Sequence, residues 1–103
     1  MTTVINIYHK KSALTTYTFI GRSTKSTKHF GNPFKIPFDG NRNEVCDKFE
    51  KWLSKEGYED IEPERRLWIL RHIYLLKDKT LGCYCKPLRC HGDYYCKLLN
   101  QEE

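Results

Sequence analysis

The sequence predicts a small α/β (α+β) domain, with a mixed three-stranded sheet and about three helices in the order β-β-α-α-β-α. Two short runs rich in β-branched and aromatic residues come first, and two segments with helical periodicity follow. A third apolar run and a last helical segment close the chain. Its 103 residues suit one modest core, so we treat residues 1–103 as a single domain.

The first two strands are expected over residues 4–8 and 16–20. Both runs contain the residue types that suit a pleated, half-buried surface. The polar link between them, residues 10–15, is short. A hairpin is therefore the simplest connection, because a parallel crossover needs about a dozen residues or more.

A long loop follows over residues 21–40, and loops of this length in a compact domain are usually functional or mobile. The net charge of +5 lies entirely in residues 1–40, because residues 41–103 carry equal numbers of acidic and basic side chains. Most of this excess falls between Arg22 and Lys35. Clustered cations favour an anionic partner, such as a nucleotide, a phosphate or a nucleic-acid backbone. A solvated basic loop is an equally good interpretation.

Two amphipathic helices are expected in the middle of the chain. The first begins near Asn43 and stops at Gly57, and its apolar stripe has helical spacing: Val45, Cys46, Phe49, Trp52 and Leu53. The second starts at Pro63, which suits the first turn of a helix, and runs to Leu76. This helix is apolar around much of its circumference, so we expect it to be well buried or shared with a second subunit in a homodimer.

The end of the chain predicts a third strand over residues 80–85 and a third helix over residues 91–100. Three of the five cysteines and one of the four histidines lie within residues 81–93. A strand that delivers thiols to a turn, followed by a helix whose first N–H groups face that turn, can do chemistry or hold an anion.

The local geometry of this cysteine block follows from its elements. On a strand, Cys83 and Cys85 point to the same face, and Pro87 ends the strand. Cys90 is expected at the N-cap of the last helix, where the helix dipole favours a thiolate. Asp93 can accept a hydrogen bond from the N-cap N–H, and its charge opposes that thiolate by a similar amount. The sequence leaves this balance at Cys90 open.

Three interpretations of the block remain. In one, the thiolate of Cys85 or Cys90 is a nucleophile and His91 is the general base or acid, with Asp93 beside them. In another, Cys83, Cys85, Cys90 and His91 bind zinc, although this spacing is tighter than zinc sites normally use. In the third, the cysteines are small core residues and the helix N-terminus holds a ligand.

Four further residues are candidates for ligand binding. Gly21 permits close approach of a ligand to the backbone, and Arg22 and Arg42 offer planar forks for phosphate. Asn32, in a Gly-Asn-Pro-Phe turn, can hydrogen-bond a ribose or a base edge. A surface salt bridge for Arg22 and a turn-stabilising role for Asn32 are equally good interpretations.

Five blocks of the sequence carry a family resemblance. They are residues 17–22, 31–34, Arg42 before an amphipathic helix, 81–87 and 90–93. In this order they resemble a small domain-of-unknown-function family found in phages and bacteria, and the likeness covers nearly the whole chain. The resemblance implies one compact α/β body with its site at these blocks. It also implies a phage-encoded role, such as an action against host processes.

Composition excludes several classes. No run of about 18 apolar residues is present, so we expect no transmembrane helix and no membrane partner. The first residues lack the features of a secretion signal, and an odd number of cysteines does not suit a secreted disulfide scaffold. We therefore expect a cytoplasmic protein with reduced thiols.

The function expected from these residues is binding of a phosphorylated small molecule, such as a nucleotide or nucleotide derivative. The pocket would lie between residues 22–34 and the start of the last helix, with hydrolysis or group transfer at its cysteines if the protein is an enzyme. One alternative is a non-catalytic phage-type protein that sequesters a nucleotide signal or inhibits a host protein. Another is nucleic-acid binding through the basic loop over residues 22–35. We expect no resident cofactor.

Overall fold

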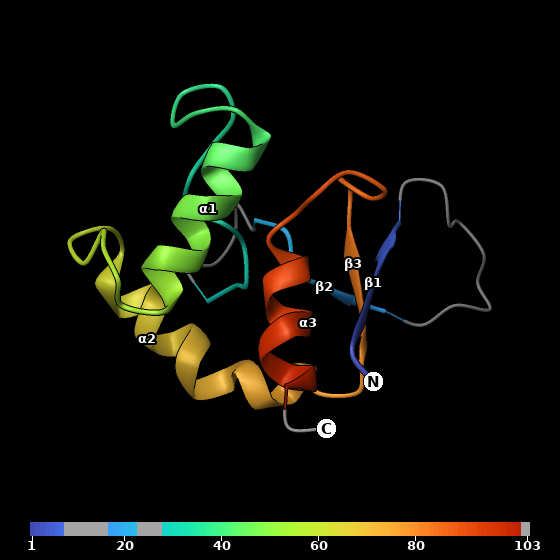
Figure 1. The fold of residues 1–103 in the computed structure, drawn as a ribbon. Coiled ribbons are helices and arrows are strands. Elements are labelled where there is room, and N and C mark those ends of the chain that lie inside the picture. Colours follow the sequence, from blue (N-terminus) through green and yellow to red (C-terminus); the bar gives the residue numbers. More distant parts are fainter. Residues whose placement is uncertain (8–16, 23–27, 102–103) are drawn as a thin grey trace.

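The computed structural model describes residues 1–7, 17–22 and 28–101. Within these residues it contains three strands, three α-helices and one 3₁₀ helix, in the order that the sequence predicts (Figure 1). The fold class is therefore confirmed. The elements are β1 (Thr3–Asn6), β2 (Thr18–Phe19), α1 (Arg42–Leu53), α2 (Pro63–His72), η1 (Ile73–Leu76), β3 (Thr80–Cys83) and α3 (Gly92–Asn100).

The strand pairing differs from the expected hairpin. The sheet order is β1-β3-β2, and β3 pairs in parallel with both of its neighbours. The hairpin between the first two strands is therefore wrong, and the described sheet is parallel rather than mixed. The physical reason is burial: Leu81, Gly82 and Cys83 of β3 are all buried, and a strand buried in this way takes the centre of a parallel sheet.

Several expectations concern residues that lie outside the described ranges. They are the ends of the first two strands at Tyr8 and Thr16, the polar link over residues 10–15, and the part of the basic loop that contains Lys25.

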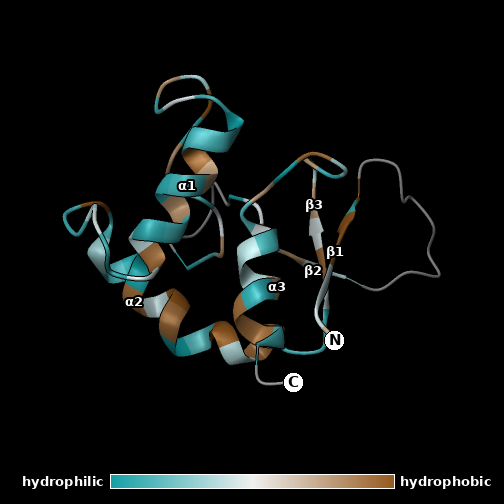
Figure 2. Ribbon diagram, viewed as in Figure 1, coloured by the Kyte–Doolittle hydropathy of each residue, from teal (hydrophilic) through white to brown (hydrophobic). Residues whose placement is uncertain are grey.

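The helices begin where their sequence signals lie, but the first two end earlier than expected. α1 ends at Leu53 rather than near Gly57, and α2 ends at His72, after which η1 continues to Leu76. Asn41 caps α1 by accepting a hydrogen bond from the Glu44 N–H, and the Glu44 side chain accepts one from the Asn41 N–H. Pro63 occupies the first turn of α2, as expected. In Figure 2, α1 alternates hydrophilic and apolar segments, as an amphipathic helix does.

The core lies where α3 meets α1 and the sheet. In Figure 1, α3 lies between the sheet on one side and the α1–α2 pair on the other. Phe49 of α1 contacts the Tyr95 ring of α3, with the ring centres 5.4 Å apart, and both residues are fully buried. At Gly92, an added Cβ would lie 2.6 Å from Ile20 and 3.0 Å from Val4. A glycine here thus lets the start of α3 approach the sheet closely.

Within the described residues, every helix is too short or too polar to span a bilayer.

Candidate functional site: a thiol pocket

The parallel sheet brings two distant segments of the chain together. Because β2 and β3 run in the same direction, the residues after Phe19 and the residues after Cys83 leave the sheet at the same edge. Ligands of parallel α/β sheets bind outside this carboxyl edge. Gly21 and Arg22 follow β2 here, and Cys85 follows β3.

A pocket of about 420 Å³ lies at this edge. Residues from both segments line it, so the cysteine turn and the Arg22 segment share one cavity, as predicted. We call it the thiol pocket. Its lining residues are Phe19, Gly21, Arg22, Asn32, Phe34, Ile36, Arg42, Val45, Cys46, Cys83, Tyr84, Cys85, Arg89, Cys90 and His91.

Three thiols, those of Cys83, Cys85 and Cys90, line the pocket together. Cys83 and Cys90 are buried, and their Sγ atoms are 3.5 Å apart. Hydrogen bonds from Cys83 and Cys90, together with the Arg42 guanidinium, lower the pKa of Cys85 far below its ordinary value. Cys85 is therefore the candidate thiolate of this group.

The sequence left open whether Cys90 is a thiol or a thiolate, and its surroundings in the structure favour the thiol. Its hydrogen bonds with Cys83 and Cys85, and then its burial, raise the pKa of Cys90. The N–H of Gly92, at the start of α3, acts in the opposite direction but is outweighed. Cys90 therefore remains a thiol. The N-cap of α3 is His91, so the expectation that Cys90 is the N-cap is wrong by one residue.

The pocket is electropositive. Among the described residues that line it, three are arginines and none is acidic. Arg89 is already paired, because its Nη2 lies 2.9 Å from Asp47 and 2.8 Å from Glu50. Arg42 donates from Nη1 to the carbonyl of Arg89 at 3.2 Å, and its charge acts on Cys85. Arg42 is thus the cation of the pocket most available to an anion, while Arg22 adds its positive charge from the backbone carbonyls that it holds.

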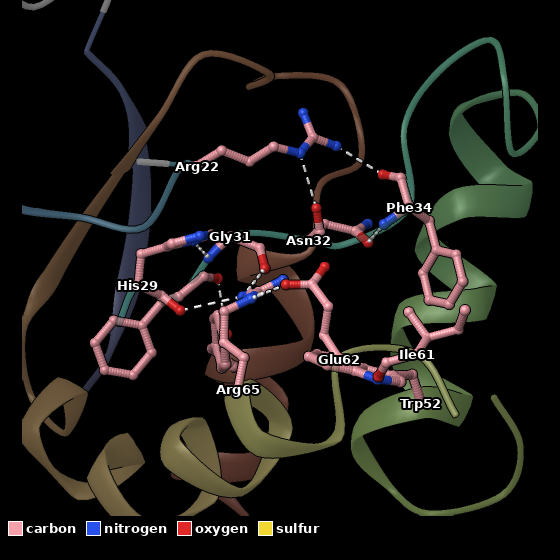
Figure 3. Close-up of polar contacts among 11 residues, drawn as sticks. Arg22, His29, Gly31, Asn32, Phe34, Trp52, Ile61, Glu62 and Arg65 are labelled. Atoms are coloured by element: carbon pink, nitrogen blue, oxygen red, sulfur yellow. Dashed lines mark hydrogen bonds and ion pairs between the residues drawn. The ribbon is translucent and has the colours of Figure 1, made fainter. Parts of the chain in front are cut away.

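Asn32 and Phe34 form another part of the lining, and we call their segment, Gly31–Phe34, the loop wall. Arg22 donates from Nε to the carbonyl of Asn32 at 2.9 Å and from Nη2 to the carbonyl of Phe34 at 2.7 Å (Figure 3). Arg65 of α2 also holds this segment, because its Nη1 donates to the carbonyl of Gly31 at 2.6 Å. Two arginines from distant parts of the chain therefore fix this wall.

Both polar atoms of the Asn32 side chain are bonded to the backbone of the protein. Its Oδ1 accepts from the Phe34 N–H at 2.8 Å, and its Nδ2 donates to the carbonyl of Val45 at 3.1 Å. The side chain is buried as well as part of the pocket lining. Of the two interpretations of Asn32, the structure thus displays the turn-stabilising one.

His91 joins the end of β2 to the start of α3. Its Nε2 lies 2.8 Å from the carbonyl of Ile20, and a carbonyl oxygen only accepts, so Nε2 carries the proton. Burial lowers the pKa of His91, so the ring is neutral at pH 7. The ring also contacts Phe49, with centres 5.2 Å apart. These contacts hold the ring in place at the edge of the pocket.

Asp93 does not line the pocket. Its Oδ2 accepts from the Cys90 N–H at 3.1 Å, which confirms the predicted hydrogen bond, and its Oδ1 pairs with the Lys86 ammonium. Asp93 therefore ties the cysteine turn to the first turn of α3.

The zinc interpretation receives no support from the described part of the chain. Within it, no group of three or more histidine, cysteine, aspartate or glutamate side chains is arranged to hold a metal ion.

Comparison with known proteins places the chain in a family. A family model described as Domain of unknown function (DUF4326) matches residues 5–101. The chain belongs to this family. The predicted resemblance to a domain-of-unknown-function family is therefore confirmed. Neither the curated proteins nor the solved structures compared with the chain include a significant match.

Sequence reasoning missed some residues of the pocket in this DUF4326 chain. Phe19 and Tyr84 form an edge-to-face pair with centres 5.8 Å apart, and both are exposed at the pocket. A signal for them existed, because each is the last but one residue of a predicted strand and lies within two residues of a candidate residue. Cys46 was assigned only to a helix stripe, and its Sγ lies 3.8 Å from the carbonyl of Arg89.

Proposed function

We propose that this protein binds a phosphorylated small molecule, a nucleotide or nucleotide derivative, in the thiol pocket and transfers part of it through the Cys85 thiolate. The observation that carries the proposal is the placement of Cys85, whose pKa is lowered by its neighbours, in a pocket with three arginines and no acidic lining residue among those described. A thiolate of lowered pKa beside a cation is the arrangement of reactive cysteines.

The size and chemistry of the pocket support a nucleotide. Its volume of about 420 Å³ lies in the range of small-molecule sites. Arg22 and Arg42 supply cations for a phosphate. The exposed rings of Phe19 and Tyr84 offer a surface on which a base can stack.

The reaction step is a displacement on the bound molecule. The Cys85 sulfur attacks an electrophilic carbon, a carbon–sulfur bond forms, and the leaving group departs with the bonding electron pair and takes a proton from water. A second water then attacks the same carbon, expels Cys85 as a thiolate and releases a proton to solvent. The sum is hydrolysis, and an acceptor hydroxyl in place of the second water gives group transfer.

The other predicted catalytic residues have supporting roles in this proposal. Cys90 donates its S–H to the Cys85 sulfur and keeps it anionic. His91 and Asp93 act as positioning residues, because the Nε2–H of His91 is bonded to Ile20 and the Asp93 carboxylate is bonded to Cys90 and Lys86.

The first test measures the reactivity of the thiols. Iodoacetamide is added to the folded protein at pH 6, and the modified cysteines are identified by peptide mass spectrometry. Cys85 should react about a hundredfold faster than Cys96, because burial raises the pKa of Cys96. Cys85→Ser should lose the fast reaction, and Cys96→Ser should keep it. Equal rates at the two cysteines would remove the basis of the proposal.

The second test concerns the ligand. Native mass spectrometry of the purified protein, and of protein mixed with nucleoside mono-, di- and triphosphates, should show one bound molecule per chain. Cys85→Ser should keep the binding and lose any turnover of the bound molecule. A molecule that is recovered unchanged after heating would favour the sequestering alternative. Affinity for oligonucleotides that falls steeply with salt would favour nucleic-acid binding.

A further inference from the structure

The outward face of α2 and η1 carries apolar side chains that the described fold leaves exposed. Leu67, Tyr74 and Leu75 are 43%, 66% and 50% exposed. The opposite face of the same segment buries Ile69 and Leu76 completely. Figure 2 shows apolar stretches along α2 and η1, and Figure 1 shows α2 at the side of the molecule away from the sheet.

Charged residues flank the apolar ones on this face. Glu64, Leu67, Trp68 and Arg71 have the spacing i, i+3, i+4 and i+7, so they form one stripe along α2. Glu64 and Arg71 are both exposed. We call these four residues the α2 stripe.

A groove runs beside the stripe. It has a volume of about 650 Å³, and Pro63 and all four residues of the α2 stripe contribute to its lining. Trp68 forms part of its wall, with its ring stacked on His72 at a centre distance of 4.7 Å. The groove is therefore a concave surface next to a projecting leucine, which suits ridge-into-groove packing of helices.

The charges of the stripe are self-complementary. Its centre lies between Leu67 and Trp68, and Glu64 and Arg71 are placed at equal steps on either side of that centre. When two copies of α2 are laid antiparallel across this centre, Glu64 of each copy faces Arg71 of the other. A two-fold interface makes the same contact twice, so both charge pairs form together.

We propose that the α2 stripe and its groove bind a second copy of this chain, in an antiparallel two-fold dimer. Leu67 of each copy enters the groove of the other beside Trp68, and the Glu64–Arg71 pairs fix the register. The proposal involves no residue of the thiol pocket and stands independently of the proposed function. An interface of one helix and one groove from each copy is small, below about 1,200 Å² in total, so the dimer should be weak and concentration-dependent.

The test uses charge reversal on the full chain. Sedimentation velocity from about 1 µM to about 500 µM protein should show dimer formation by the wild type. Glu64→Arg and Arg71→Glu each place like charges against one another and should weaken the association about tenfold or more. The double variant with both changes restores two opposite-charge pairs and should regain the dimer.

A matched control accounts for effects on helix stability. Arg71→Glu places an acid in the last turn of α2, which the helix dipole disfavours. Lys97→Glu does the same in the last turn of α3 and should leave the dimer unchanged. A wild type that stays monomeric at every concentration, single variants that dimerise like the wild type, or a folded double variant that stays monomeric would each overturn the proposal.

A second measurement needs no variant. Trp52 is fully buried, so a quencher such as acrylamide reports mainly on Trp68. Diluting the wild-type protein through the dissociation range should increase the quenching of Trp68, because dilution uncovers the groove. Quenching that is constant with dilution, while sedimentation shows a dimer, would place the interface elsewhere and overturn the proposal.

Discussion

The two walls of the thiol pocket use arginine in different ways. In the loop wall, Arg65 is 5% exposed and its donors are directed to Glu62 and to the carbonyls of His29 and Gly31. Cys83, Cys85 and Cys90 form a second part of the lining, which we call the thiol wall. Beside it, Arg42 is only partly buried and its charge acts on Cys85. One arginine therefore fixes the shape of the pocket, and the other sets its reactivity. Stability and reactivity should be separable by mutation within a single pocket.

The largest expected effect is the loss of stability when the loop wall loses its contacts with Arg65. Arg65→Met should lower the free energy of unfolding by about 3 kcal/mol, because two backbone carbonyls lose their donor in a buried place. Methionine keeps much of the packing against the Trp52 ring, over which the guanidinium lies at 5.4 Å. Urea denaturation followed by fluorescence measures the loss.

Two comparisons make this result specific. Arg65→Lys keeps the charge but not the planar fork, so it should lose less stability than Arg65→Met. The pH midpoint of Cys85 alkylation, measured where the protein is folded, should not move. A midpoint that shifts with Arg65→Met would show that the two walls are not separable.

The helices could be predicted because their signals are local. The stripe from Val45 to Leu53, the proline at the start of α2 and the cap of α1 all lie within a few residues of the element that they define. The hairpin was wrong because the signal that decides it is not local. β3 enters between the first two strands from about sixty residues further along the chain.

The candidate site likewise divides into features that local sequence predicts and features that only contacts between distant segments reveal. Cys85, Cys90, Arg22 and Arg42 were predicted to share a pocket, and the parallel sheet brings them together. Their individual roles needed distances. The neighbouring thiols and the Arg42 cation, which lower the pKa of Cys85, indicate which of the sulfurs favours the thiolate. The contact of His91 with Ile20 joins residues 71 positions apart, and no local pattern indicates it.

A smaller effect, on the reactivity of Cys85, is expected when Arg42 is replaced. Arg42→Gln removes the cation that helps to lower the pKa of Cys85. The pH midpoint of Cys85 alkylation should rise by about one unit, which slows the reaction about tenfold below the midpoint. The rate of iodoacetamide modification as a function of pH measures it.

Arg89→Gln is the matched control for this change. Arg89 lines the same pocket, but its charge is paired with Asp47 and Glu50. This variant should leave the alkylation midpoint of Cys85 in place. Equal shifts in the two variants would mean that the overall positive charge of the pocket, rather than Arg42 itself, holds the thiolate.

The smallest expected effect is a pH dependence of the free energy of unfolding, which arises from the pair of Glu62 with Arg65, the arginine that holds the loop wall. The hydrogen bond from Arg65 lowers the pKa of Glu62 below its ordinary value of 4.5. A carboxylate with a lowered pKa stabilises the fold above the unfolded value and loses that contribution as the pH falls through the folded value. The Glu62 side chain is 50% exposed, so solvent screens the pair and the contribution should be about 0.5 kcal/mol.

This contribution can be measured as a difference between variants. Unfolding by urea at pH 6 and at pH 3 should show a smaller loss of stability in Glu62→Gln than in the wild type, because glutamine does not titrate. Glu59→Gln removes an exposed carboxylate from the same segment and should keep the wild-type pH dependence. In the Arg65→Met background, Glu62→Gln should change nothing, since the partner that lowers the pKa is gone. If the difference persists there, another group holds Glu62, and Arg65 stabilises the loop wall through its carbonyl contacts alone.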